Sequence, residues 1–172
     1  MKKEKIKIIL VMAVTADGKI ARDTQDRVDW TGKADKAYFV DVTQSAGAMI
    51  MGSTTFEAIG RVLPGRKSIV MTRKKSRKSD HPDLIFSSET PEEIIAGLEQ
   101  EGYASAALIG GATVNSLFME KGLVDEIHLT VVPLLFGSGL SLFKTPLDAR
   151  LELIEMKLLE KDCLLFKYRV NL

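Results

Sequence analysis

The sequence predicts an α/β protein: a mostly parallel sheet with helices on both faces and an antiparallel hairpin at the C-terminus. Short apolar stretches alternate with amphipathic stretches of helical period along most of the chain, which is typical of a parallel sheet. Two of the apolar stretches end in small residues that lead directly into a helical stretch. The last two segments have no helix between them, so they are expected to pair as a hairpin.

Composition limits the classes of protein. A length of 172 residues is typical of one domain, so we predict a single domain over residues 1–172. Lys and Arg number 24 against 23 Asp and Glu, and this balance counts against a nucleic-acid or membrane-surface binder. The single cysteine, Cys163, excludes an internal disulfide, and with two histidines it argues against a zinc site. Without a signal-peptide pattern or a long apolar span, the expected location is the cytoplasm.

The first strand is expected at Ile6–Val14, which is apolar on both faces from Ile8 and therefore suits a central position in the sheet. Thr15–Trp30 follows as a long polar stretch with four aspartates. Connections of this length are usually functional or disordered.

Gly32–Ala46 has the period of a helix, and Asp35 stands at the N-terminal end of its apolar face, which Phe39, Val42 and Ala46 continue. A carboxylate in an apolar stripe costs free energy unless it is paired or hydrogen-bonded. Asp35 is thus a candidate for binding a cationic or amidine-like edge or for acid–base chemistry. A role in stabilising the helix dipole is an equally good interpretation of the residue alone.

The remaining elements follow from the same patterns. Further strands are predicted at Ala48–Met51, Ser68–Met71, Leu84–Phe86, Ala104–Ile109 and Asp125–Val132, and the hairpin at Leu151–Leu159 and Cys163–Leu172. Three more helices are predicted: a brief one ending at Ile59, one from Thr90 to about Gly102, and one from Gly111 to Lys121. The second has Thr at its cap, Pro at its first position and Glu at its third, which is a helix-start signature.

Two turns between a strand and a helix are candidates for binding an anion. The first is Gly52-Ser53-Thr54-Thr55 and the second begins at Gly110-Gly111. Free backbone N–H groups and the helix dipole favour negative charge at such places, and two turns could hold the two ends of a pyrophosphate. Neither turn is a GxGxxG fingerprint or a P-loop, and tight turns with nothing bound remain the alternative.

The basic run Arg73–Lys78 has no aromatic residues among its cations, so it offers bases no stacking platform. Most of it is expected to be a solvated loop, while its first members could neutralise a ligand phosphate. His128 and Cys163 are expected to be structural residues of strands.

Four stretches together resemble the dihydrofolate reductase superfamily. They are the first strand with Asp17–Ala21, Trp30–Phe39, Met51–Arg66 (MGSTTFEAIGRVLPGR) and Ile109-Gly110-Gly111. The third is the most specific, and the resemblance spans Ile6 to about Val132.

The resemblance implies NADPH-dependent reduction of 7,8-dihydrofolate, with hydride passing from nicotinamide C4 to pterin C6 and a proton going to N5. In this reading Asp35 grips the aminopyrimidine edge of the pterin, Thr130 supports Asp35, and Trp30 closes over the pterin. Arg66 pairs with the α-carboxylate of the glutamate tail. No metal is implied.

The resemblance also implies the lining of two subsites. The substrate would contact Val11, Ala13, Phe39, Ile59, Leu63 and Ile109 besides Asp35, Arg66 and Thr130. The cofactor would contact Ala13, Ile20, Gly52, Ser53, Thr54, Thr55, Met71, Thr72, Arg73, Ile109, Gly110, Gly111, Ala112, Thr113 and Val114. Thr72 and Arg73 would meet the adenosine 2′-phosphate, which favours NADPH over NADH.

The sequence departs from this pattern at Lys36, Ser53 and Asn115, which replace an apolar, a basic and an aromatic residue of the family. Val132–Phe143 is more similar to the reductase domain of riboflavin biosynthesis, which makes a reductase of a ribosylamino-pyrimidine the alternative. The joint presence of Asp35 and Arg66 favours folate. A nucleotide-binding module without catalysis is the third reading, and both a monomer and a homodimer fit the sequence.

Overall fold

The computed structural model describes residues 5–171, and predictions that fall on residues 1–4 and on Leu172, the expected end of the hairpin, lie outside them. The helices are α1 (Gly32–Ala46), α2 (Ser53–Ile59), α3 (Pro91–Gln100) and α4 (Ala112–Glu120). The strands are β1 (Lys7–Thr15), β2 (Lys19–Ala21), β3 (Ala48–Gly52), β4 (Lys67–Met71), β5 (Leu84–Ser87), β6 (Ser105–Leu108), β7 (Glu126–Val132), β8 (Leu140–Ser141), β9 (Arg150–Glu160) and β10 (Cys163–Asn171).

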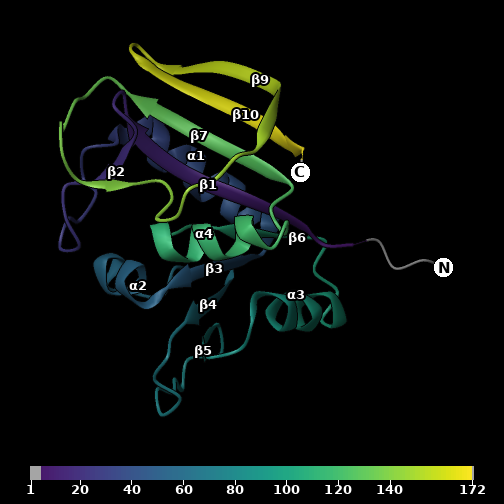
Figure 1. The fold of residues 1–172 in the computed structure, drawn as a ribbon. Helices are drawn as coiled ribbons and strands as arrows, with labels where there is room; N and C mark the ends of the chain where they lie inside the picture. Colours follow the sequence, from purple (N-terminus) through teal and green to yellow (C-terminus); the bar gives the residue numbers. More distant parts are fainter. Residues whose placement is uncertain (1–4, 172) are drawn as a thin grey trace.

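Eight strands form one sheet in the order β5-β4-β3-β6-β1-β7-β10-β9 (Figure 1). The six strands from β5 to β7 are parallel, and β10 is antiparallel to both β7 and β9. This confirms the predicted α/β class with a C-terminal hairpin at one edge. Strand β1 lies between β6 and β7, as its two apolar faces predict.

The two faces of the sheet have separate cores. On one face, α3 and α4 pack Ile94, Leu98 and Phe118 against Ile8 and Leu10 of β1. On the other face, apolar side chains of α1 and α2 pack against the alternate residues of the same strands: Phe39, Val42, Phe56 and Ile59 against Val11, Met49 and Met51. Among residues 5–171, no helix is long and apolar enough to cross a membrane.

Helix ends follow the local sequence. Helix α1 has the predicted bounds and stops at Gly47, whose φ of +76° lets its N–H bond the carbonyls of Thr43 and Gln44. At the start of α3, the Thr90 hydroxyl and the Glu93 carboxylate form the predicted reciprocal cap.

The small sheet of β2 and β8 is absent from the sequence prediction, because strands of three and two residues have no readable period. It joins the polar stretch Thr15–Trp30 to the segment Val132–Phe143. Asp17 strengthens this junction, since its carboxylate accepts bonds from the N–H groups of Phe136 (3.2 Å) and Gly137 (2.7 Å). The hydroxyl of Thr15, followed by these backbone groups, lowers the pKa of Asp17 to about 2.

Candidate active site

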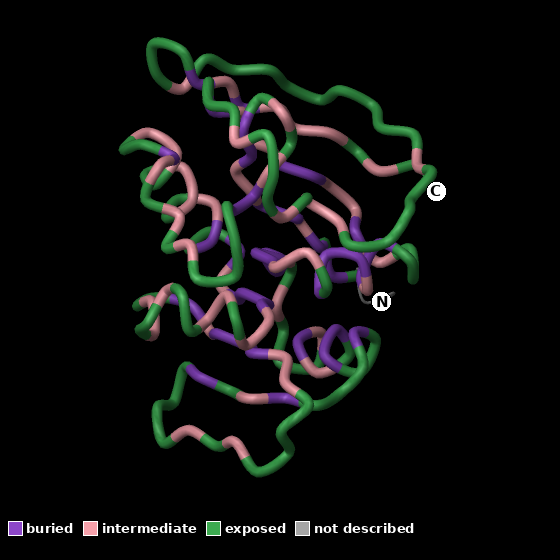
Figure 2. The backbone as a smooth tube through the Cα atoms, turned by 60° about the vertical axis from the view of Figure 1, so that its left-hand side comes forward, coloured by how far each residue is buried: buried purple, intermediate pink, exposed green. Residues whose placement is uncertain are grey.

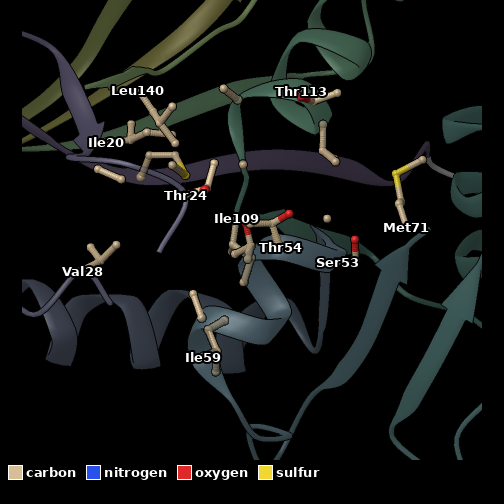
Figure 3. Close-up of a pocket in the computed structure, with 18 of the residues that line it drawn as sticks. Ile20, Thr24, Val28, Ser53, Thr54, Ile59, Met71, Ile109, Thr113 and Leu140 are labelled. Atoms are coloured by element: carbon tan, nitrogen blue, oxygen red, sulfur yellow. The ribbon is translucent and has the colours of Figure 1, made fainter. Parts of the chain in front are cut away.

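A cavity of about 1560 Å³ opens at the carboxyl ends of the parallel strands, where open α/β sheets bind their ligands. Figure 3 shows its extent: Val28 and Ile59 lie toward one end, Ser53 and Met71 toward the other, and Ile109 lies between them. Helices α1 and α2 flank the first end, and the carboxyl end of β4 flanks the second (Figure 3). One continuous pocket therefore has room for two ligands placed end to end.

Asp35 lines the pocket from the first turn of α1. Burial raises the pKa of its carboxyl, while hydrogen bonds from the side chains of Thr31 and Thr130 and the charge of Lys36 oppose that rise. Thr130 is 2% exposed on β7, so it reaches Asp35 from behind the pocket wall. Asp35 is thus a half-buried carboxylate that faces the cavity and is held from its protein side.

Thr31 is a partner that the sequence reading missed. It occupies the N-cap position of α1, but its side chain makes no capping bond and instead contacts Asp35. A threonine directly before a helix is normally read as a cap, so the sequence contained no sign of this second role.

The two glycine turns lie side by side, because the N–H of Gly52 donates to the carbonyl of Gly110 at 2.8 Å. Neither α2 nor α4 has a side-chain cap, so the first-turn N–H groups are left for another acceptor. A Cβ at Gly52 would stand 3.1 Å from Val114, and one at Gly110 would stand 3.1 Å from the sulfur of Met12. The turns need glycine to approach this closely, and the resulting cradle fits a pyrophosphate.

The basic run divides into two parts. Arg73, Lys74 and Lys75 line the pocket beyond β4, together with Ser87 and Ser88. Arg77 does not, since its guanidinium lies 4.2 Å from the centroid of Phe86 and pairs with Glu57 at 2.9 Å. Arg73, Lys74 and Lys75 therefore stand at the end of the pocket where the adenosine part of a dinucleotide would lie. A 2′-phosphate on the adenosine would suit these cations.

Most predicted site residues line this one pocket. They are Val11, Ala13, Ile20, Asp35, Phe39, Gly52, Ser53, Thr54, Thr55, Ile59, Leu63, Met71, Thr72, Arg73, Ile109, Gly111, Ala112, Thr113 and Val114. Four others, Trp30, Arg66, Gly110 and Thr130, stand outside the lining. Thr130 still touches the site through Asp35, and Gly110 through its bond to Gly52.

Arg66, the predicted carboxylate-binding residue, packs against α1 outside the pocket lining. Its side chain is buried, at 5% exposure, and its Nη1 donates to the hydroxyl of Thr43 and, at 3.3 Å, to the carbonyl of Val40. Both acceptors belong to α1, so the guanidinium ties the turn after α2 to that helix. The PGR sequence forms a turn as predicted, and the structure shows its arginine bonded to α1.

Trp30, which was predicted to close over the pterin, packs against Phe136 outside the pocket lining. Its ring meets Phe136 edge-on, with centroids 5.2 Å apart, and Arg22 lies 4.4 Å from the centroid of Phe136 on the same cluster. These contacts attach the polar stretch Thr15–Trp30 to the loop after β7, outside the pocket lining.

Two loops supply lining residues that sequence reasoning did not name individually. They are Asp23, Thr24, Asp26, Arg27, Val28 and Asp29 from the polar stretch, and Gly139, Leu140, Ser141, Phe143 and Lys144 from the segment before β9. Helix α4 holds the second loop, because Asn115 Nδ2 donates to the carbonyl of Leu142 at 3.0 Å and Ser116 accepts from the N–H of Lys144 at 2.8 Å. The fully buried Asn115 is thus an anchor for the pocket wall.

His128 lies outside the lining, as its expected structural role requires. Its ring bonds the hydroxyl of Tyr38 at 2.7 Å and the carboxylate of Glu126 at 3.1 Å. Burial lowers the pKa of the imidazole, an effect that the bond to Glu126 opposes. The three side chains join α1 to the sheet.

Comparison with known proteins agrees with this geometry. The family model of the RibD C-terminal domain matches residues 6–165. A dihydrofolate reductase of Lactococcus lactis is 30% identical over 139 residues, which cover 80% of this chain and 79% of that protein.

Solved structures share the fold. A putative riboflavin biosynthesis protein from a Shewanella species superposes with a TM-score of 0.83 at 21% identity, covering 96% of this chain and 99% of that one. The Enterococcus faecalis dihydrofolate reductase, solved with NADP(H), gives 0.75 at 21% identity and 96% coverage of both. The chain therefore belongs to the RibD C-terminal domain family, a family of NADPH-dependent reductases with the dihydrofolate reductase-like fold described above.

Proposed function

We propose that this protein reduces 7,8-dihydrofolate to 5,6,7,8-tetrahydrofolate with NADPH, as a cytoplasmic enzyme of one-carbon metabolism. The observation that supports this most is Asp35, a half-buried carboxylate at one end of the pocket, with cations at the other end. Such a pocket can bind a pyrimidine edge at the carboxylate and the phosphates of a dinucleotide at the other end.

The second half of the pocket fits the cofactor. The cradle at Gly52 and Gly111 holds the pyrophosphate, Arg73 meets the 2′-phosphate, and Ala13 and Ile20 border the nicotinamide. When bound, NADPH supplies the hydride, so the protein needs no nucleophile of its own. The remaining work of the protein is to orient the substrate and to manage one proton.

Asp35 performs that work. Its carboxylate accepts two hydrogen bonds from the neighbouring N–H groups of an aminopyrimidine edge, and this charge-assisted pair fixes the ring. Negative charge beside the ring also favours the form of the substrate that is protonated at N5. Thr31 and Thr130 keep the carboxylate in place, and Phe39 and Ile59 exclude water from the rings.

A second candidate is the reduction of a ribosylamino-pyrimidine that carries a phosphate. The burial of Arg66 supports it, because the residue expected to recognise the folate glutamate stands outside the pocket lining. Instead Arg27, Arg61 and Lys36, the residue after Asp35, line the pocket. These cations suit an anionic tail, and Asp35 would grip the pyrimidine in either substrate.

The experiment is a parallel assay of NADPH oxidation with dihydrofolate and with the phosphorylated ribosylamino-pyrimidine. We expect dihydrofolate to give the higher kcat/KM. A tenfold preference for the pyrimidine would replace the first proposal by the second. Tight NADPH binding without turnover of either would instead favour a nucleotide-binding module.

A further inference from the structure

The guanidinium of Arg77 joins the loop between β4 and β5 to a helix and a strand. Its Cζ lies 4.2 Å from the ring centroid of Phe86 on β5 and 5.8 Å from that of Phe56 on α2. Its Nη1 pairs at 2.9 Å with the carboxylate of Glu57, which also belongs to α2. The two rings meet edge-on with centroids 5.6 Å apart, so the arginine completes a cluster that three elements build together.

The same loop carries the cations that line the pocket. Figure 2 shows the connection from β4 to β5 as a mostly exposed loop at the bottom of the molecule. The N–H of Thr72 donates to the carbonyl of Ser87 at 2.8 Å, and the hydroxyl of Thr72 accepts from the N–H of Lys74 at 3.2 Å. The N–H of Arg77 then donates to the carbonyl of Lys74 at 3.1 Å and closes a turn. A side chain that holds Arg77 in place therefore also holds the segment Arg73–Lys75.

Helix α2, to which Arg77 is attached, begins in the glycine-turn cradle. Ser53–Thr55 lines the pocket at the start of the helix, and Phe56 and Glu57 follow directly. In NADPH only one ribose separates the 2′-phosphate from the pyrophosphate arm, so two sites for these groups must keep a fixed spacing. A site held at that spacing before the ligand arrives binds it more tightly, because less ordering remains to be done on binding. Arg77 connects the helix that bears one site with the loop that bears the other.

We infer that Arg77 is a positioning residue for cofactor specificity: it holds the loop so that Arg73 faces the 2′-phosphate, and it thereby sets the preference for NADPH over NADH. The inference rests on the proposed place of Arg73 at the 2′-phosphate. Arg77 is outside the pocket lining, so it acts through the loop. A planar guanidinium can stack on Phe86 and bond Glu57 at once. The competing explanation is that Arg77 attracts the phosphates only as one more positive charge.

Fluorescence titration of the full chain with NADPH and with NADH separates position from charge. Arg77→Gln should raise the NADPH dissociation constant about fivefold and leave that of NADH unchanged, because NADH has no 2′-phosphate. Lys78→Gln is the matched control, since it removes the same charge from the next, exposed residue and should alter neither constant. Glu57→Gln breaks the ion pair but removes a negative charge. Position predicts about threefold weaker NADPH binding in this variant, whereas charge alone predicts tighter binding.

A double variant completes the test. In the background of Arg73→Gln, the further change Arg77→Gln should alter the NADPH constant less than about twofold, because the side chain that Arg77 positions is gone. Full additivity, an equal loss with NADH, an equal loss in Lys78→Gln, or unchanged or tighter NADPH binding by Glu57→Gln would each overturn the inference. Circular dichroism of each variant establishes that it is folded.

The single variant Arg73→Gln distinguishes the inference from the proposal on which it rests. Unaltered NADPH binding in Arg73→Gln would refute the proposed 2′-phosphate site and the inference with it. A loss in Arg73→Gln without a loss in Arg77→Gln would refute the inference alone and leave the 2′-phosphate site in place.

Discussion

The substitution Asp35→Asn removes one negative charge from the pocket and changes little else. The amide keeps the size of the carboxylate, and its oxygen can still accept bonds from Thr31 and Thr130. It replaces one of the two acceptors with a donor, so the aminopyrimidine edge meets an N–H group where the proposed pairing needs an oxygen.

The expected loss follows from the two bonds. A hydrogen bond to a charged group contributes about 1.5–3 kcal/mol, and the pair is half-buried, so the transition state should lose about 3–5 kcal/mol. Since 1.36 kcal/mol corresponds to tenfold, kcat/KM for dihydrofolate at pH 7 should fall roughly 100- to 5000-fold. The loss should shrink at low pH, where the substrate is already protonated. NADPH oxidation followed across pH measures both effects.

Stability should change in the opposite direction. Burial raises the pKa of Asp35, so the charged form opposes folding. The stability associated with this group is therefore present at low pH, where the carboxyl is neutral in both states, and is lost as pH rises through its folded pKa. Asp35→Asn should be more stable than wild type to urea at pH 7, with the difference disappearing in acid.

An exposed cation on the same turn of α1 provides the control, since Lys33→Gln, outside the pocket lining, should change turnover much less than Asp35→Asn. Unaltered turnover of Asp35→Asn at pH 7 would refute the role of the carboxylate. A variant that loses stability along with activity would show damage to the fold and would refute the electrostatic argument.

Three further predictions concern the cofactor end, the buried arginine Arg66 and the loop junction at Asp17. Arg73→Gln should raise the NADPH dissociation constant about tenfold and leave that of NADH unchanged, while Lys78→Gln, outside the pocket lining, alters neither in a fluorescence titration. Arg66→Leu should lower the free energy of unfolding by about 1–3 kcal/mol through the lost hydrogen bonds to Val40 and Thr43, with similar KM changes for substrate and cofactor; a selective rise in the substrate KM would support the carboxylate role. The pKa of Asp17 is lowered to about 2, so the stability that its carboxylate contributes to the junction is present at neutral pH and is lost only as pH falls through about 2. The emission of the single tryptophan, Trp30, should therefore show no step near pH 4 from this junction. A step near pH 4 that disappears in Asp17→Asn would contradict the assignment.

The sequence was sufficient to predict those elements that have a regular apolar period and a residue, such as glycine, that ends them. Helix α1 could be predicted to its ends because its apolar period is long and Gly47 stops it. The glycine turns could be predicted because close backbone approach leaves few residue types. Asp35 could be singled out as a charge in an apolar stripe, although only the structure shows that the stripe borders a cavity.

Side-chain direction was beyond the sequence. Arg66 follows a readable turn, but the acceptors that bury it belong to α1, more than 20 residues earlier in the chain. The alternation of the hairpin was equally clear, yet which face a helix would cover depends on the sheet order. Long-range packing decides both questions, and no local pattern records it.

The two ends of the pocket are built differently. This explains why the family match indicates the cofactor but does not by itself select one of the two substrates. The cofactor end consists of strand ends and helix starts, whose glycine turns are fixed by contacts such as Gly52 to Gly110. The proposed substrate end combines α1 and α2 with two loops, and these loops are held by the Asp17 junction and by Asn115 and Ser116 of α4. Loops tolerate exchange where strand ends do not, so cations near Asp35 can be redistributed without disturbing the NADPH cradle. A single fold can thus keep NADPH as its reductant and the carboxylate of Asp35 as its proposed pyrimidine-binding group. The anionic tail of the substrate can meanwhile change from a carboxylate to a phosphate.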